Sequence, residues 1–170
     1  MFPIYHTKQD FYNLLSHHGI PYEILDHPPV YTVEDMDAFG ITQRGNIAKN
    51  LFLRDGSGKR HFLILLGKDK HVDLHQLREA IGCSRLSFAS EERLAKYLCV
   101  KPGAVSPLGV LNDTQKAVEI YIDEDFQTEM RFGCHPNDNT ATVFLDFQDL
   151  MKLLLEHGNR VGFIKIRPPS

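Results

Sequence analysis

The chain has 170 residues and 42% hydrophobic content, which is enough for one sizeable core and short for two ordinary domains. Its 19 Lys and Arg against 22 Asp and Glu give a formal net charge of -3, so no overall positive field attracts nucleic acid and any such contact has to be a local patch. Three cysteines without CxxC spacing speak against a disulfide framework and a structural zinc site, and the longest apolar run, residues 62–66, is too short to cross a bilayer. We therefore expect one soluble domain over residues 1–170 in a reducing cytoplasm, with residues 167–170 as a loose tail and no membrane partner.

Local signals near the beginning of the chain predict two helices. Residues 7–10 form a capping box, and the apolar residues that follow lie on one helical face until Gly19, so a helix is expected over residues 7–18. A short extended segment at residues 21–25 leads into a His-Pro-Pro turn, and a second capping signal at residues 32–35 predicts a short helix.

The next segment has the pattern of a β-hairpin followed by helices. Two apolar runs at residues 49–53 and 61–66 are separated by Asp-Gly-Ser-Gly, which is the turn chemistry of a hairpin. Helical spacing at residues 73–81, and two glutamates at the beginning of residues 90–98, predict two surface helices.

The last third of the chain alternates strand-like and helical segments. Strands are expected at residues 118–122, 140–145 and 162–166, with a helix at residues 146–157. Because the elements lack a strict βαβ rhythm, we expect a mixed α/β fold, a mixed sheet surrounded by helices, in place of a doubly wound one.

Charge is segregated along the chain. Residues 44–71 carry seven Lys and Arg against two Asp, whereas residues 119–129 carry five Asp and Glu and no basic residue. A basic hairpin is usually a solvated surface, but on an acidic protein it is also where a phosphate backbone would dock.

Lys49 is the first candidate for chemistry, because it stands at the mouth of a strand that is otherwise apolar. One interpretation is a side chain whose stem packs and whose ammonium reaches water. The other is a cation directed at a phosphate or carbonyl oxygen in a cleft.

A second candidate is the segment Gly103-Ala104-Val105-Ser106-Pro107, where a glycine and a proline bracket small residues. Its backbone can approach a ligand closely and offer N–H groups to a developing oxyanion. The same pattern also occurs in ordinary loops, and this alternative stays open.

His135 lies in a polar turn before an apolar strand and is a candidate ligand or water-orienting group. The adjacent Cys134 is a poor nucleophile for it, because neighbouring residues of an extended chain point to opposite faces. The alternative is a turn held by Asn and Asp side chains.

Nine histidines are present, but no HExxH, paired cysteine, P-loop or Gly-x-Ser-x-Gly pattern accompanies them, so we expect no metal and no nucleotide cofactor.

Several motifs in series resemble the YbaK/ProX family of prolyl-tRNA editing domains. The motifs, in order, are residues 26–32 (Asp-His-Pro-Pro-Val-Tyr-Thr), 49–53 (Lys-Asn-Leu-Phe-Leu), 86–89 (Leu-Ser-Phe-Ala), 103–107 and 135–142 (His-Pro-x-x-Asn-Thr-Ala-Thr). The resemblance covers nearly the whole chain and is closest to the freestanding ProX type. The one departure is the Asn-Asp pair at 137–138, where relatives often have a more apolar pair.

The resemblance implies a barrel-like central sheet and metal-independent hydrolysis of the ester between an amino acid and the terminal adenosine of tRNA. It implies the catalytic residues Lys49, Gly103 and His135. It also implies a substrate-binding set made of His27, Val30, Thr32, Asn50, Ala104, Val105, Ser106, Pro107 and Asn139. The expected partners are the 3′ acceptor end of aminoacylated tRNA and, as a further candidate, prolyl-tRNA synthetase.

The expected substrate is Ala-tRNA(Pro), cleared by a placed water, a lysine and a glycine-loop oxyanion site, with selection by pocket size. Three alternatives remain at this point. The same fold could hydrolyse another misacylated tRNA such as Cys-tRNA(Pro), the chain could bind aminoacyl-tRNA without turnover, or it could be an interaction domain with an incidental basic hairpin.

Overall fold

The computed structural model describes residues 4–128 and 131–166, so the tail expected at 167–170 lies outside the described residues. The helices are α1 Lys8–His17, α2 Val33–Ala38, α3 Leu74–Ile81, α4 Glu91–Leu98 and α5 Phe147–His157, with short 3-10 helices η1 Ile41–Gln43, η2 Pro107–Asn112 and η3 Glu124–Thr128. The strands are β1 Tyr22–Asp26, β2 Asn46–Arg54, β3 His61–Gly67, β4 Ser87–Phe88, β5 Val118–Asp123, β6 Arg131–Cys134, β7 Ala141–Asp146 and β8 Val161–Ile164. None of the described helices has the length and apolar character that a membrane span requires.

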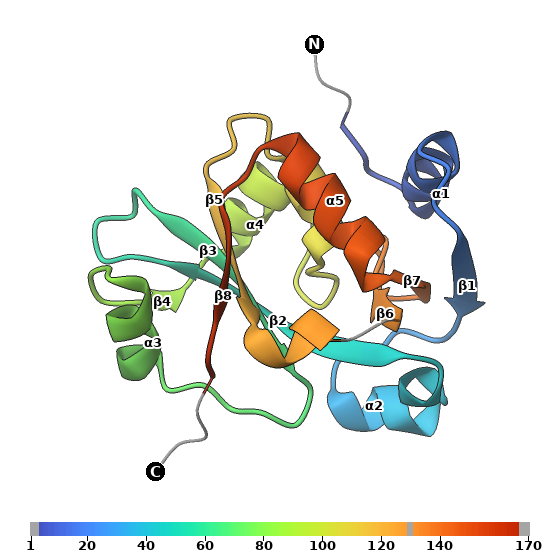
Figure 1. The fold of residues 1–170 in the computed structure, drawn as a ribbon, viewed down its shortest axis with the longest axis horizontal. Coiled ribbons are helices and arrows are strands. Elements are labelled where there is room, and N and C mark those ends of the chain that lie inside the picture. Colours follow the sequence, from blue (N-terminus) through green and yellow to red (C-terminus); the bar gives the residue numbers. More distant parts are fainter. Residues whose placement is uncertain (1–3, 129–130, 167–170) are drawn as a thin grey trace.

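One mixed sheet organises these elements. Its order is β1-β7-β6-β2-β3-β5-β8, and β4 pairs with β2 beside this path. β2 and β3 form the predicted antiparallel hairpin, whereas β2 pairs with β6, and β3 with β5, in parallel. Figure 1 shows α4 and α5 together on one side, α3 near the turn of the hairpin, and α2 beside the opposite end of β2. The predicted mixed α/β fold with surrounding helices is confirmed.

The two capping boxes form as predicted. The Thr7 hydroxyl accepts from the backbone N–H of Asp10, whose carboxylate accepts from the N–H of Thr7, and Thr32 and Asp35 repeat this arrangement at α2. Each box satisfies donors that a helix N-terminus leaves without partners. α2 nevertheless buries none of its residues, so it lies on the surface as a short, separate element.

β2 is packed on both faces, and this fixes which side chains reach the main core. Ala48 and Phe52 belong to the large apolar cluster that includes residues of α1, α4 and α5, whereas Leu53 belongs to a second cluster with Leu77 of α3. Alternation along a strand explains the split, because successive side chains point to opposite faces. Lys49, between Ala48 and Asn50, therefore projects away from the main core.

The basic and acidic segments of the sequence meet in the structure. The parallel pairing of β3 with β5 brings Arg60 to Glu119, where two guanidinium nitrogens each donate at 2.9 Å, and Lys70 lies 2.8 Å from the fully buried carboxylate of Asp123. Lys70 also contacts Asp125 at 2.6 Å. Part of the positive charge of residues 44–71 is thus neutralised by ion pairs with the acidic segment, and the exposed patch is weaker than the sequence suggests.

Candidate active site

A cavity of about 610 Å³ opens beside the first half of β2, at the end of the hairpin away from its turn. Its lining comes from α2, β2, the segment after β3, the glycine loop and β6. The predicted site residues that line it are Thr32, Lys49, Asn50, Gly103, Val105 and His135. Residues more than 100 positions apart in the sequence, such as Thr32 and His135, therefore meet in one cavity.

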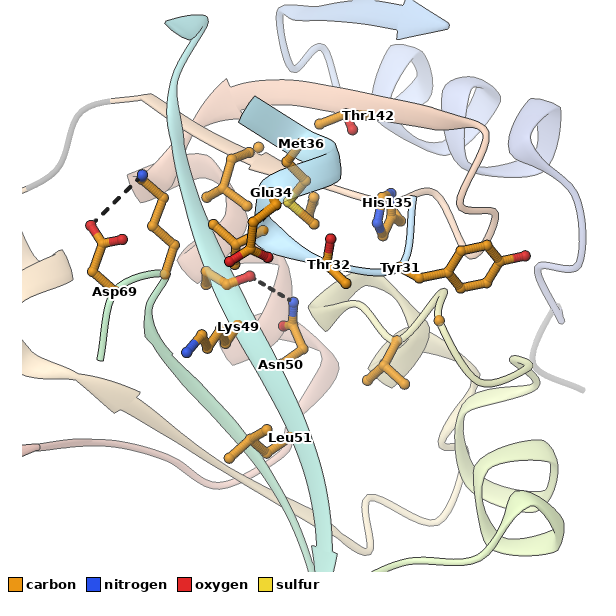
Figure 2. Close-up of a pocket in the computed structure, with 18 of the residues that line it drawn as sticks. Tyr31, Thr32, Glu34, Met36, Lys49, Asn50, Leu51, Asp69, His135 and Thr142 are labelled. Carbon is orange, nitrogen blue, oxygen red and sulfur yellow. Dashed lines mark hydrogen bonds and ion pairs between the residues drawn. The ribbon is translucent and has the colours of Figure 1, made fainter. Parts of the chain in front are cut away.

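Lys49 is partly buried, and its ammonium has a defined position. Its Nζ donates to the backbone oxygen of Lys70 at 2.8 Å. Figure 2 shows Lys49 and Asn50 on opposite sides of β2, with Lys49 on the side of Asp69 and Asn50 on the side of His135. An ammonium has three donors, so two remain for a ligand.

Asn50 lies where an edge of β2 has no strand partner. Along this edge of β2, β6 pairs with Asn46 and Ile47, and β4 pairs with Leu53 and Arg54. Among the described residues no strand pairs with the middle of that edge, which lines the cavity. The Asn50 amide donates to the oxygen of Ala48 at 3.3 Å, while its own buried Oδ1 has no hydrogen-bond partner among the described residues. A buried acceptor without a partner costs on the order of 1–3 kcal/mol, which favours satisfaction by a bound donor.

His135 is 8% exposed and held in one orientation. Its Nδ1 lies 2.9 Å from the oxygen of Ala141, and because a carbonyl only accepts, Nδ1 carries the proton and Nε2 keeps its lone pair. Burial lowers the pKa of His135 below its ordinary value; the Ala141 carbonyl acts in the opposite direction and the neighbouring His27 lowers it further. A neutral ring that accepts through Nε2 suits the placement of water or of a hydroxyl group.

The glycine loop is more constrained than the sequence indicates. Gly103 has φ +88°, and a Cβ at this position would lie 3.3 Å from the Tyr31 ring, so a side chain would be both strained and crowded. The N–H of Ala104 already donates to the oxygen of Lys101 at 3.2 Å, which removes it from the candidate oxyanion donors. The loop also ends earlier than expected, because Ser106 caps η2 through its hydroxyl.

Six predicted substrate-binding residues do not line the cavity. They are His27, Val30, Ala104, Ser106, Pro107 and Asn139. Val30, Ala104 and Ser106 are buried in packing, and Pro107 begins η2.

Two of these residues instead hold the segment that precedes α2. The side-chain amide of Asn139 donates to the backbone oxygen of Val30 at 3.2 Å, and the N–H of Val30 donates to the backbone oxygen of Asn139 at 3.3 Å. His27 bonds the Thr142 hydroxyl at 2.8 Å, and its ring centroid lies 6.1 Å from that of His135. In the structure these residues thus contact residues that line the cavity or precede α2, and the prediction that they bind substrate is not tested.

The sequence did not single out several lining residues. They include Val33, Glu34, Met36, Ile47, Ala48 and Asp69. For the residues of α2, the signal in the sequence was the capping box at Thr32, which predicted the helix but not which side chains of the helix line a cavity. Glu34 lines the cavity, and among the described residues its carboxylate has no hydrogen bond or ion pair.

Cys134 is excluded as a nucleophile near neutral pH. The side chain is buried, and burial raises the pKa of the thiol to about 12, although the Ser106 hydroxyl acts in the opposite direction. Among residues 4–128 and 131–166, no group of three or more His, Cys, Asp or Glu side chains is placed to bind a metal ion.

Comparison with known proteins places this site in a family. The model of the aminoacyl-tRNA editing domain matches residues 27–153. The chain is 44% identical over 160 residues to the prolyl-tRNA editing protein ProX of Acetoanaerobium sticklandii, covering 94% of this chain and 98% of the relative. It is 31% identical to prolyl-tRNA synthetase associated domain-containing protein 1 of Danio rerio, covering 88% and 82% of the two chains.

A solved structure supports the fold. The crystal structure of a putative trans-editing enzyme for prolyl tRNA synthetase superposes with a TM-score of 0.71 at 19% identity, covering 95% of this chain and 97% of that one. The matched residues 27–153 include the cavity residues Tyr31, Lys49, Gly103 and His135. The chain therefore belongs to the family of aminoacyl-tRNA editing domains.

Proposed function

We propose that the chain is a deacylase that acts in trans on misacylated tRNA(Pro), with Ala-tRNA(Pro) as its main substrate. The observation that carries this proposal is the convergence of Lys49, Gly103 and His135 on one cavity. The name of the ProX relative supports the substrate class. An aminoacyl ester is already activated, so a site that positions water and stabilises an oxyanion is sufficient for hydrolysis.

The reaction we propose needs no protein nucleophile. Water attacks the acyl carbon and gives up a proton, and the carbonyl oxygen becomes an oxyanion. When the oxyanion collapses back to a carbonyl, the ester bond to the ribose breaks and the ribose oxygen takes up that proton. His135 orients the water or a ribose hydroxyl through Nε2, which is consistent with a neutral ring held by Ala141. The N–H groups of the glycine loop other than that of Ala104 stabilise the oxyanion.

Lys49 binds the phosphate of the terminal nucleotide in this scheme. Its ammonium lies beside Lys70 and projects from the side of β2 opposite to Asn50, which favours a phosphate over the acyl carbonyl as its target. A flexible stem and a compact charge suit this role. Asn50, on the His135 side, offers its unpartnered Oδ1 to a substrate hydroxyl or ammonium donor.

Glu34 recognises the free amino group of the aminoacyl ester. Figure 2 shows its side chain directed over β2, between Lys49 and His135. A carboxylate without a partner would repel a phosphate, so its presence in a tRNA site favours a cationic substrate group beside it. The α-ammonium of the amino acid is the group of that charge in the substrate.

Pocket size selects the amino acid. Val33, Met36, Ile47 and Ala48 supply apolar walls around the proposed acyl position. A methylene group in such a pocket is worth about 1–3 kcal/mol, so serine or cysteine esters are expected to be weaker substrates and the larger proline ester to be excluded. Prolyl-tRNA synthetase, which would form the mischarged tRNA, is the proposed source of substrate.

A panel of tRNA(Pro) charged with alanine, cysteine, serine or proline tests the proposal. We expect release of alanine to be fastest and of proline to be negligible. Faster release of cysteine would select the Cys-tRNA(Pro) alternative. Binding of all four tRNAs without release of any amino acid would contradict the deacylase and identify a binding module.

A further inference from the structure

Tyr31 is a large aromatic side chain that stands open to solvent at the edge of the cavity. It is 73% exposed, although it lines the same cavity as His135 and Lys49. Among the described residues its hydroxyl has no hydrogen-bond partner, and no other aromatic ring packs against it. Core packing therefore does not account for an aromatic residue here.

The position of Tyr31 is well defined in spite of this exposure. Its N–H donates to the Asp35 carboxylate at 3.0 Å, and the preceding residue, Val30, is hydrogen-bonded to both the side-chain amide and the backbone oxygen of Asn139. The ring lies against Gly103, where a Cβ added to the glycine would meet ring carbons at 3.3 and 3.4 Å. Gly103 thus supports one part of the ring and leaves the remainder free.

The arrangement of the cavity shows what this free ring can contact. Figure 2 shows Tyr31 and Lys49 at opposite sides of the labelled group, with His135 on the side of Tyr31. If the ester lies near His135 and the phosphate lies near Lys49, the base of the same nucleotide has to contact a third part of the cavity lining. Tyr31 is an exposed aromatic ring in the lining, and every nucleobase has a face that can stack on such a ring.

We propose that Tyr31 is the stacking platform for the base of the 3′-terminal nucleotide of the tRNA. This inference rests on the proposed function and adds a positioning residue to it. Stacking on Tyr31 holds the nucleotide by its base, so the ester bond on the ribose is directed toward His135 and the glycine loop. Gly103 then has two roles, one in the oxyanion site and one as the surface behind the ring.

The chain contains no tryptophan, which allows a direct binding test. Tyr31→Trp places a single indole at the site, and Phe88→Trp, at a ring that is 63% exposed on β4 outside the cavity, is the matched control. Both are titrated with adenosine 5′-monophosphate and with a cytidylyl-cytidylyl-adenosine trinucleotide. We expect a saturable change in emission for Tyr31→Trp and none for Phe88→Trp. An unchanged Tyr31→Trp emission, or equal changes in both variants, would overturn the proposal.

Kinetics separate a stacking role from a structural one. With Ala-tRNA(Pro), Tyr31→Ala is expected to raise KM by roughly 5- to 150-fold with little change in kcat, the effect of losing one stacked base. Tyr31→Phe, which keeps the ring, should stay close to the parent. Equal KM values for Tyr31→Phe and Tyr31→Ala would refute stacking.

The two tests also separate this inference from the proposed function. A parent protein that releases alanine while Tyr31→Trp does not respond to nucleotide would refute the platform alone. A Tyr31→Trp protein that responds while the parent releases no amino acid would refute the deacylase and support the platform.

Discussion

The two ends of the β2–β3 hairpin use polar side chains in different ways. At the turn end, the 6%-exposed carboxylate of Asp55 accepts from the Ser57 hydroxyl and from the N–H groups of Lys59 and Arg60. Nε2 of the buried His61 bonds Arg93 there, and its Nδ1 has no partner among the described residues. At the open end, Asn50 keeps a buried oxygen without a partner, Lys49 makes one hydrogen bond, and Glu34 makes none among the described residues.

The difference indicates which end of the hairpin maintains the fold and which one is suited to a ligand. Buried polar groups that the protein satisfies itself stabilise the native state, whereas groups left unsatisfied reduce its stability unless a ligand or water completes them. Both ends belong to the same two strands, so local sequence composition does not distinguish them. Variants at the turn end should therefore change unfolding, and variants at the open end should change catalysis.

The largest effect is expected at the open end. Lys49→Ala should reduce kcat/KM for Ala-tRNA(Pro) by on the order of 100- to 1,000-fold, because it removes a charge that stabilises the bound phosphate ester. The free energy of unfolding should stay close to that of the parent, since the lysine is only partly buried and has one hydrogen bond. Single-turnover deacylation and urea unfolding measure the two quantities.

Lys59→Ala is the matched control, because Lys59 is an exposed lysine at the turn of the same hairpin. Its deacylation rate should equal that of the parent. If Lys49→Ala retained parental activity, or if both variants lost it equally, the assignment of the open end as the active site would be wrong.

The next largest effect is a pH dependence of stability at the turn end. His61 is fully buried against Tyr97, at 4.2 Å between ring centroids, and Nη1 of Arg93 lies 2.7 Å from its Nε2. Burial, and then Arg93, lower the pKa of His61 to about 4. The folded state thus binds this proton less readily than the unfolded state, so the stabilisation is complete above about pH 6.5 and decreases as pH falls toward 4, by up to about 3 kcal/mol.

His61→Gln tests this dependence, because an amide can still accept from Arg93 and does not titrate. The free energy of unfolding measured by urea between pH 7 and 4 should decrease less steeply in this variant than in the parent. His75→Gln, at an exposed histidine of α3, should keep the parental slope. Parallel curves for the parent and His61→Gln would show that His61 does not contribute.

The parts of the fold that local chemistry determines were predictable from the sequence. The capping box at Thr7 and the turn after Arg54 each lie within a few residues, and both formed as expected. β6 was missed because it is only four residues long, and its place in the sheet depends on pairing with β7 on one side and with Asn46 and Ile47, more than 80 positions earlier, on the other. The neutralisation of Arg60 by Glu119 was equally hidden, since it depends on the pairing of β3 with β5.

The candidate site was predictable only as far as its motifs. Lys49, Gly103 and His135 line one cavity. Val30 and Asn139 belong to the same motifs but pack behind the lining residues, and the motifs alone did not separate the two groups. That distinction depends on the direction of each side chain, which short motifs do not specify. The proposed roles of Tyr31 and Glu34 depend on which parts of the fold lie opposite residues 31–34, and the periodicity of the sequence does not give this information.

The smallest predicted effect concerns the preference of the active site for a substrate whose α-amino group is free, which we attribute to Glu34. N-acetylation of the alanyl ester removes its positive charge, so the parent should hydrolyse Ala-tRNA(Pro) faster than N-acetyl-Ala-tRNA(Pro). Because Glu34 is exposed and solvent screens its charge, Glu34→Gln should narrow the ratio of the two rates by only about three- to fivefold. Glu91→Gln, at an exposed glutamate of α4 that does not line the cavity, should leave the ratio unchanged. An unaltered ratio in Glu34→Gln would show that the carboxylate does not recognise the ammonium, and steric exclusion by the α2 wall would then account for any preference for the unblocked ester.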